Sequence, residues 1–136
     1  MIEIRTMTRQ DGSTVVLDLD ARHREEMAAA RVQTGRLIPE PTEVWSLVRN
    51  GDPLAIFGIR PRQNLAFTTF LARPGFYDGI GPTLAIARHC RALKQECPGR
   101  VLVARSWGAH WATLRWFEKL GFGIAGRDGD ARLFVM

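Results

Sequence analysis

The sequence predicts one domain of the α/β (α+β) class spanning residues 1–136, and three observations support this. Short runs of strand-forming residues alternate with stretches whose apolar residues recur at helical spacing. No Pro/Gly/Ser-rich or low-complexity segment divides the 136 residues, which is a usual length for one domain. The composition, 46% hydrophobic and 24% charged, is that of a globular chain able to bury a core.

The N-terminal part of the chain is expected to begin with a strand. Ile2 and Ile4 alternate with charged residues, which predicts a strand with one buried face. After a turn at residues 11–13, good helix formers fill residues 19–32, and Gly35 is expected to end that helix.

The next segment is expected to hold a second helix and then a hairpin. Thr42 would cap a short helix over residues 43–49, which Asn50-Gly51 would end. The apolar runs 53–59 and 65–71, with a turn between them, predict two adjacent strands. Neither face of the second run is clearly polar, which is typical of a strand buried in the middle of a sheet.

The second half of the chain alternates helices and strands. Residues 83–96 carry an apolar stripe after a segment rich in glycine. Residues 101–104 predict a brief buried strand, and residues 109–120 an amphipathic helix that Gly121 closes in a left-handed conformation. Residues 122–125 and 131–135 flank a hairpin signal.

Charge and cysteine content restrict the partners and the compartment. The net charge of +5 could attract nucleic acid or an anionic cofactor, but arginines are scattered along the chain, and a coding bias gives the same sum. No apolar run is long enough for a membrane span, and the N-terminus lacks a signal peptide's apolar segment, so a cytoplasmic protein is expected. Cys90 and Cys97 would share a helix face two turns apart, too far for a disulfide, and no metal site is predicted.

The segment from His110 to Phe122 is similar to the last helix of the GNAT superfamily of N-acetyltransferases. The match is residue for residue at Glu118-Lys119-Leu120-Gly121-Phe122, and a strand hairpin follows. The resemblance covers the second half of the chain well and the first half by the order of elements. It implies a mixed, mostly antiparallel sheet with helices on both faces, and acetyl-CoA as the cofactor.

The loop before the helix at 83–96 resembles the family's pyrophosphate-binding segment, Arg/Gln-x-x-Gly-x-Gly/Ala. Gly79 and Gly81 are in place, but Phe76 stands where the family has Arg or Gln, and Pro82 removes a backbone donor. Arg73 could supply the missing cation, and a tight loop with no ligand is the alternative. The cofactor-binding residues that the resemblance implies are Phe70, Arg73, Gly79, Ile80, Gly81, Thr83, Ser106, His110 and Phe117.

At the family's usual acid–base positions, this chain has residues that cannot exchange a proton. The family's tyrosine on the last helix corresponds to Phe117, and residues 65–71 contain no Asp or Glu. His110 and Tyr77 are the candidate catalytic residues, because a histidine exchanges protons near neutral pH and Tyr77 lies beside Gly79. The alternatives are that His110 caps or packs at its helix and that Tyr77 anchors its loop.

The tryptophans and Ser106 each allow two interpretations, whereas His23 and His89 have one simple interpretation. Trp107, Trp111 and Trp116 fall around one helix and belong either to the core or to an exposed docking patch. Ser106 follows a strand and either contacts a cofactor or caps the helix. His23 and His89 are expected on the solvated surface.

The chain also resembles the small GNAT-like internal virion proteins of short-tailed bacteriophages. The segments that carry this likeness are Pro53-Leu54-Ala55-Ile56, Arg127-Asp128-Gly129-Asp130 and Leu133-Phe134. Two functions follow: an acetyl-CoA-dependent N-acetyltransferase with degenerate catalytic positions, or a non-catalytic virion or assembly protein on the same fold. The implied partners are a small amine or protein N-acceptor, or other virion proteins. Host cytoplasm and virion interior are the implied compartments, an oligomer stays open, and nucleic-acid binding rests on net charge alone.

Overall fold

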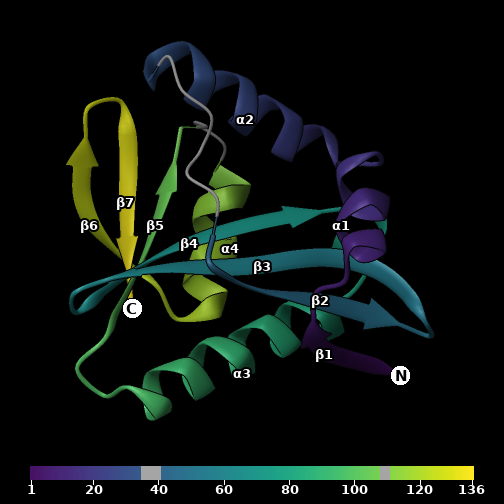
Figure 1. Ribbon diagram of the computed structural model, residues 1–136. Helices are drawn as coiled ribbons and strands as arrows, with labels where there is room; N and C mark the ends of the chain where they lie inside the picture. The colour runs from purple at the N-terminus through teal and green to yellow at the C-terminus, as the bar shows by residue number, and fades with distance from the viewer. Residues whose placement is uncertain (35–40, 108–110) are drawn as a thin grey trace.

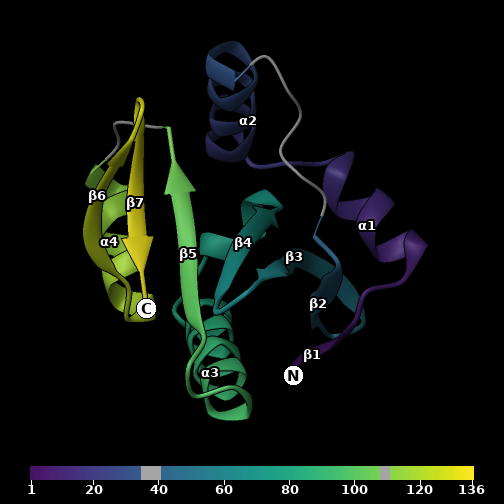
Figure 2. The ribbon, with the colours of Figure 1, turned by 60° about the vertical axis from the view of Figure 1, so that its left-hand side comes forward.

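A computed structural model describes residues 1–34, 41–107 and 111–136; for residues 30–34 it describes the backbone and not the side chains. The fold is built on one seven-stranded sheet in the order β1-β2-β3-β4-β5-β7-β6, in which only the β4–β5 pair is parallel. Helices α1 and α2 lie over one face, and α3 and α4 over the other (Figure 1 and Figure 2). The elements are β1 (Ile2–Thr6), α1 (Arg9–Val16), α2 (Ala21–Thr34), β2 (Glu43–Arg49), β3 (Asp52–Arg62), β4 (Leu65–Ala72), the short 3₁₀ helix η1 (Pro74–Tyr77), α3 (Gly81–Glu96), β5 (Val101–Ser106), α4 (Trp111–Leu120), β6 (Gly123–Asp128) and β7 (Ala131–Val135).

The expected mixed, mostly antiparallel sheet with helices on both faces is confirmed. β4 lies at the centre of the sheet, as its lack of a polar face indicated. Gly121 has φ +102° directly after α4, as expected of the residue that closes the helix. Gly35 lies outside the described residues.

Residues 43–49 form strand β2, so the prediction of a helix there is wrong. β2 is paired on both sides, with β1 and β3, and its Trp45 and Leu47 face the core under α3. Asn50 and Gly51 have φ +51° and +81°, which suits a two-residue hairpin turn rather than a helix end. Pairing on both edges outweighs the capping potential of the residue before the segment.

Residues 9–16 form helix α1, so the turn expected at residues 11–13 is also wrong. Thr8 caps the helix: its side chain accepts from the Asp11 N–H, and the Asp11 carboxylate accepts from the Thr8 N–H. Asp11 is buried and also accepts from Arg5 and from Ser46 Oγ at 2.8 Å. Burial raises the pKa of Asp11, but these hydrogen bonds together hold it below its usual value.

The core lies mainly between the sheet and α3. Ile86, Cys90 and Leu93 of α3 pack on buried residues of the central strands. Because α3 ends at Glu96, Cys97 is exposed while Cys90 is buried, so the two cysteines do not share a face as expected. Within the described segments, no helix is long and apolar enough to cross a membrane.

Candidate functional site

The sheet splits at its centre. β4 and β5 pair only at Leu65–Val101, Ala66–Leu102 and Phe67–Val103. Beyond these pairs β4 continues along β3, and β5 continues along β7. Thr68 Oγ1 donates to the Val103 carbonyl at 3.1 Å, at the point where the strands separate. The inner edges of the two strands past this point lack a neighbouring strand.

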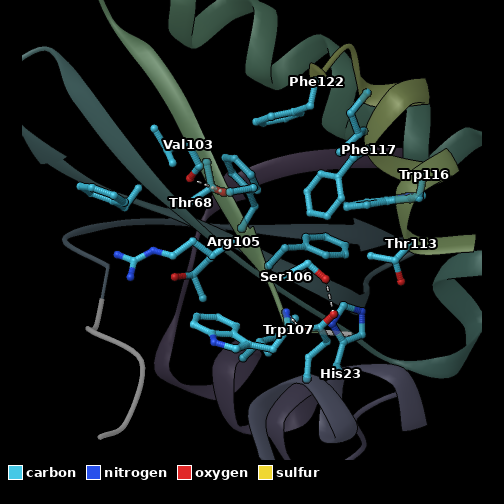
Figure 3. Close-up of a pocket in the computed structure, with 18 of the residues that line it drawn as sticks. His23, Thr68, Val103, Arg105, Ser106, Trp107, Thr113, Trp116, Phe117 and Phe122 are labelled. Atoms are coloured by element: carbon cyan, nitrogen blue, oxygen red, sulfur yellow. Dashed lines mark hydrogen bonds between the residues drawn. The ribbon is translucent and has the colours of Figure 1, made fainter. Parts of the chain in front are cut away.

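A cleft of about 1000 Å³ occupies the split, a size at the upper end of small-molecule sites. Strands β3, β4 and β5 form its floor and sides, and side chains from α2 and α4 reach into it (Figure 3). Its volume and its position between two strand ends make it the candidate active site.

One wall of the cleft is a layer of aromatic side chains on the side of α3 and α4. Trp116 stacks on Phe70 with ring centroids 4.8 Å apart, and its Nε1–H donates to Thr83 Oγ1 at 3.2 Å. Phe117 stacks on Phe134 at 4.3 Å. Figure 3 shows Trp116 and Phe117 side by side at the cleft. The layer excludes water from that wall and gives it an apolar surface.

The opposite face of the strands carries arginines. Arg60 and Arg62 belong to β3, and Arg105 belongs to β5. The sequence analysis placed Arg60 and Arg62 in a turn, but β3 extends through them. Pro61 is tolerated in this extension because the pairing of β3 with β2 reaches only to Ile59, so no described strand pairs with that edge of β3 at Pro61.

Glu26 of α2 closes one end of the cleft. Its carboxylate accepts from Ser106 Oγ at 2.5 Å and from the Trp107 N–H at 2.8 Å. The contact ties α2 to the end of β5. Of the described residues that line the cleft, Glu26 is the only carboxylate.

His23 and Tyr77 form a hydrogen-bonded pair beside Glu26. The Tyr77 hydroxyl lies 2.7 Å from His23 Nε2, and the two rings stack. Burial lowers the pKa of His23 to about 4, since the opposing influence of Asp20 and Glu26 is smaller, so the imidazole is neutral at pH 7. Burial likewise raises the pKa of Tyr77, which keeps its proton. The expectation that His23 lies on the solvated surface is therefore wrong.

His89 is not a solvated surface residue either. Its ring contacts Trp45 with centroids 4.4 Å apart, and it also packs on Phe57. Its Nε2 is buried without a hydrogen-bond partner among the described residues. Burial lowers the pKa of His89, so this histidine also favours the neutral form.

The loop expected to bind pyrophosphate has its glycines, but Arg73, the expected cation, is engaged elsewhere. Gly79 has φ +137°, a conformation that favours glycine, and α3 begins at Gly81. Arg73 instead bonds Asp18 at 3.1 Å, and Asp52 and the Pro53 carbonyl at 2.9 Å. Its guanidinium thus holds together the α1–α2 connection and the start of β3.

The structure brings some of the sequence-predicted site residues together at the cleft and leaves others outside it. Phe70, Tyr77, Ser106 and Phe117 line it. Arg73, Thr83 and the loop residues Gly79, Ile80 and Gly81 are not among its lining residues. His110 lies outside the described residues.

The sequence analysis did not place His23, Glu26 or the three arginines in the site. His23 and Glu26 lie three residues apart on the helix that the sequence predicted, a spacing that puts them on one face, and this was the available signal. The three arginines had no such signal, because their approach depends on strand pairing.

The tryptophans do not form one group. Trp116 is in the aromatic layer, Trp107 lines the cleft from the end of β5, and Trp111 is 65% exposed on α4. Trp116 thus packs against the core, as one alternative holds, and Trp111 is exposed; that Trp111 belongs to a docking patch stays a prediction.

Solved structures similar to this chain include several N-acetyltransferases. The PaiA N-acetyltransferase of Thermoplasma acidophilum, in complex with coenzyme A, has a TM-score of 0.72 at 12% identity, over 99% of this chain and 98% of that one. The N-acetyltransferase PseH of Campylobacter jejuni, in complex with acetyl coenzyme A, has a TM-score of 0.65 at 11% identity, over 100% and 98% of the two chains. An acetyltransferase of the GNAT family from Streptococcus pneumoniae has a TM-score of 0.65 at 14% identity, with the same coverage.

These similarities show that the chain has the GNAT fold. No protein-family model and no curated protein matches the amino-acid sequence.

Proposed function

We propose that the chain is an acetyl-CoA-dependent N-acetyltransferase. The observation that carries the proposal is the split between β4 and β5, with its cleft of about 1000 Å³. Strand edges without a neighbouring strand offer N–H and C=O groups to an extended ligand. The pantetheine arm of coenzyme A is such a ligand, since it carries two amide groups. The similar structures with coenzyme A or acetyl coenzyme A bound support the same choice.

The residues of the cleft fit the acyl end of acetyl-CoA better than its diphosphate end. Phe70 and Trp116 give the acyl end an apolar wall, and the inner strand edges supply backbone donors. At the diphosphate end, the loop from Gly79 to the start of α3 offers backbone N–H groups. Arg73 is already neutralised by Asp18 and Asp52. Affinity would therefore come mainly from the pantetheine arm.

The protein's own groups supply the proton transfers. Bound acetyl-CoA would supply an activated acetyl thioester. Glu26 accepts a proton from the incoming ammonium, because it is the carboxylate among the described residues that line the cleft. Tyr77 holds a phenol proton for the departing thiolate, and His23 orients that phenol through their hydrogen bond.

Calorimetry with acetyl-CoA tests whether the cleft is the binding site. A Thr113→Trp variant puts a large ring into the cleft from α4, and a Glu118→Trp variant puts the same ring on the exposed side of that helix. We expect wild type and the Glu118 variant to bind acetyl-CoA and the Thr113 variant to lose binding. No heat from wild type at millimolar acetyl-CoA refutes the proposal.

An assay of free thiol released from acetyl-CoA in the presence of amines tests the chemistry. Glu26→Gln keeps an oxygen for the Ser106 and Trp107 donors but cannot take a proton. We expect kcat to fall about a hundredfold or more, the usual contribution of a positioned general base. An unchanged kcat would remove Glu26 from the mechanism.

A second candidate function is a non-catalytic virion or assembly protein on this fold. Trp111, 65% exposed on α4, favours it, because exposed tryptophans are enriched in docking surfaces. The phage assignment rests on the sequence resemblance alone. Thiol release by wild type that disappears in Glu26→Gln would contradict this candidate.

A further inference from the structure

Positively charged side chains outnumber negatively charged ones in the lining of the cleft. Four arginines line it, against one carboxylate, among the residues that the structure describes. Arg22 is already engaged, since it pairs with Asp20 at 3.4 Å and its guanidinium lies 3.9 Å from the centre of the Tyr77 ring. The positive charge of the other three, Arg60, Arg62 and Arg105, is not accounted for by these contacts.

These three arginines share one face of the sheet. Arg60 is the register partner of Phe67, and Arg62 is the partner of Leu65, so each pair projects to the same side. Phe67 is also the partner of Val103, and Arg105 lies two residues farther along β5, which returns it to the face of Val103. Its guanidinium carbon lies 5.0 Å from the centre of the Phe67 ring, in agreement with this placement.

The arginine face is opposite the aromatic layer. Phe70 stacks on Trp116 from the other side of β4, because it is three residues from Phe67 and side chains alternate along a strand. Ligands can thus contact the cleft on two chemically different sides: an apolar aromatic wall and a cationic face.

The cations of this face are available to a ligand. Among the described residues, neither Arg60 nor Arg62 has a carboxylate within ion-pair distance, and both are exposed. Arg105 reaches Asp128 at 3.6 Å, but the side chain of Asp128 is 63% exposed, and an ion pair with so exposed a partner is weak. Three guanidinium groups around one cleft would repel one another unless a counter-ion or an anionic ligand balanced them.

We propose that the acceptor is a small amine that carries a carboxylate or phosphate group, held by Arg60, Arg62 and Arg105 while its ammonium meets Glu26. This rests on the proposed function. Guanidinium forks bind both anions bidentately, so carboxylate and phosphate share the chemistry that the site recognises. Phe67, between the arginines, packs on the carbon chain that joins the two charged ends of the acceptor.

Equilibrium binding without acetyl-CoA tests the inference independently of activity. Calorimetry on the full chain compares β-alanine with propylamine, and phosphoethanolamine with ethanolamine; each pair differs in the presence of the anionic group. We expect the amines that carry an anionic group to bind about tenfold or more tightly than the matched amines that lack it, with a preference that weakens as salt rises. The tighter of β-alanine and phosphoethanolamine identifies the anion.

A pair of double variants separates the arginine face from net charge. Arg60→Gln with Arg62→Gln should weaken binding of the anionic amines about fivefold or more. Arg88→Gln with Arg91→Gln removes the same charge from exposed positions of α3 that do not line the cleft, and should leave binding unchanged. Equal weakening by both double variants, or equal binding of amines with and without the anionic group, overturns the inference.

The two proposals can fail separately. If the anionic amines bind but no thiol is released from acetyl-CoA, the anion site stands and the acetyltransferase function fails. If propylamine and β-alanine release thiol with equal kcat/KM, the function stands and the assignment of the acceptor fails.

Discussion

The half-buried, hydrogen-bonded pair of His23 and Tyr77 should make the protein sensitive to mild acid. The pKa of His23 is about 4 in the folded chain and 6.5 in the unfolded chain. The unfolded state therefore binds more protons between these values, and the stability that His23 confers is complete above pH 6.5 and declines as the pH falls toward 4. The linkage relation gives a loss of about 2 kcal/mol at pH 5 and about 3 kcal/mol at pH 4.

Other charged groups lie around His23, so its contribution to the loss must be measured against a variant that lacks it. Asp20 and Glu26 raise the pKa of His23 and Arg22 lowers it, while Tyr77 stays protonated throughout the range. The lowered pKa of His89 adds a loss of the same sign. His23→Gln removes the titrating group and keeps an amide that can bond Tyr77, so the difference between wild type and variant isolates His23.

Urea unfolding at pH 7 and pH 5 provides the assay. We expect the free energy of unfolding of wild type to drop between the two pH values by about 2 kcal/mol more than that of His23→Gln. Equal drops in the two proteins would mean that His23 is solvated in the folded state, and the assignment of a neutral, Tyr77-bonded imidazole would be wrong.

Three further changes have outcomes that follow from single contacts. Tyr77→Phe should lower kcat while leaving the Kd for acetyl-CoA unchanged, as calorimetry and thiol release would show; an unchanged kcat removes the phenol from the mechanism. Gly121→Ala should lower the urea midpoint by an amount equivalent to about 1–2 kcal/mol, because φ is +102° and the new methyl would lie 3.0 Å from Met136 Cε; no change would contradict the left-handed cap. Ser46→Ala should cost about 1–2 kcal/mol at pH 7, by thermal or urea unfolding, since the buried Asp11 carboxylate loses a donor; a neutral effect would place Asp11 in solvent.

Elements with a strong local pattern could be predicted from the sequence. The helix that Gly121 closes and the hairpin behind it agree with the structure because spacing and turn residues specify them locally. The buried position of β4 was also recoverable, since neither of its faces is polar.

Segments whose state depends on distant partners could not be predicted. Residues 43–49 have a helix-capping threonine before them, yet pairing with β1 and β3 makes them a strand. The capping box of Thr8 and Asp11 was readable in the sequence, but Gly12 made the segment look like a turn. Arg60 and Arg62 belong to the cleft only because β3 runs on past the end of β2.

Three residue pairs join β4 to β5, so the backbone connection between the two halves of the sheet is short. Trp116 links them through its hydrogen bond to Thr83 and its stacking on Phe70. A change in the angle between the halves breaks few backbone hydrogen bonds between β4 and β5, and the ring of Trp116 is one of the side-chain contacts that such a change would disturb. A smaller side chain there would widen the cleft on that side and leave every ladder of the sheet in place.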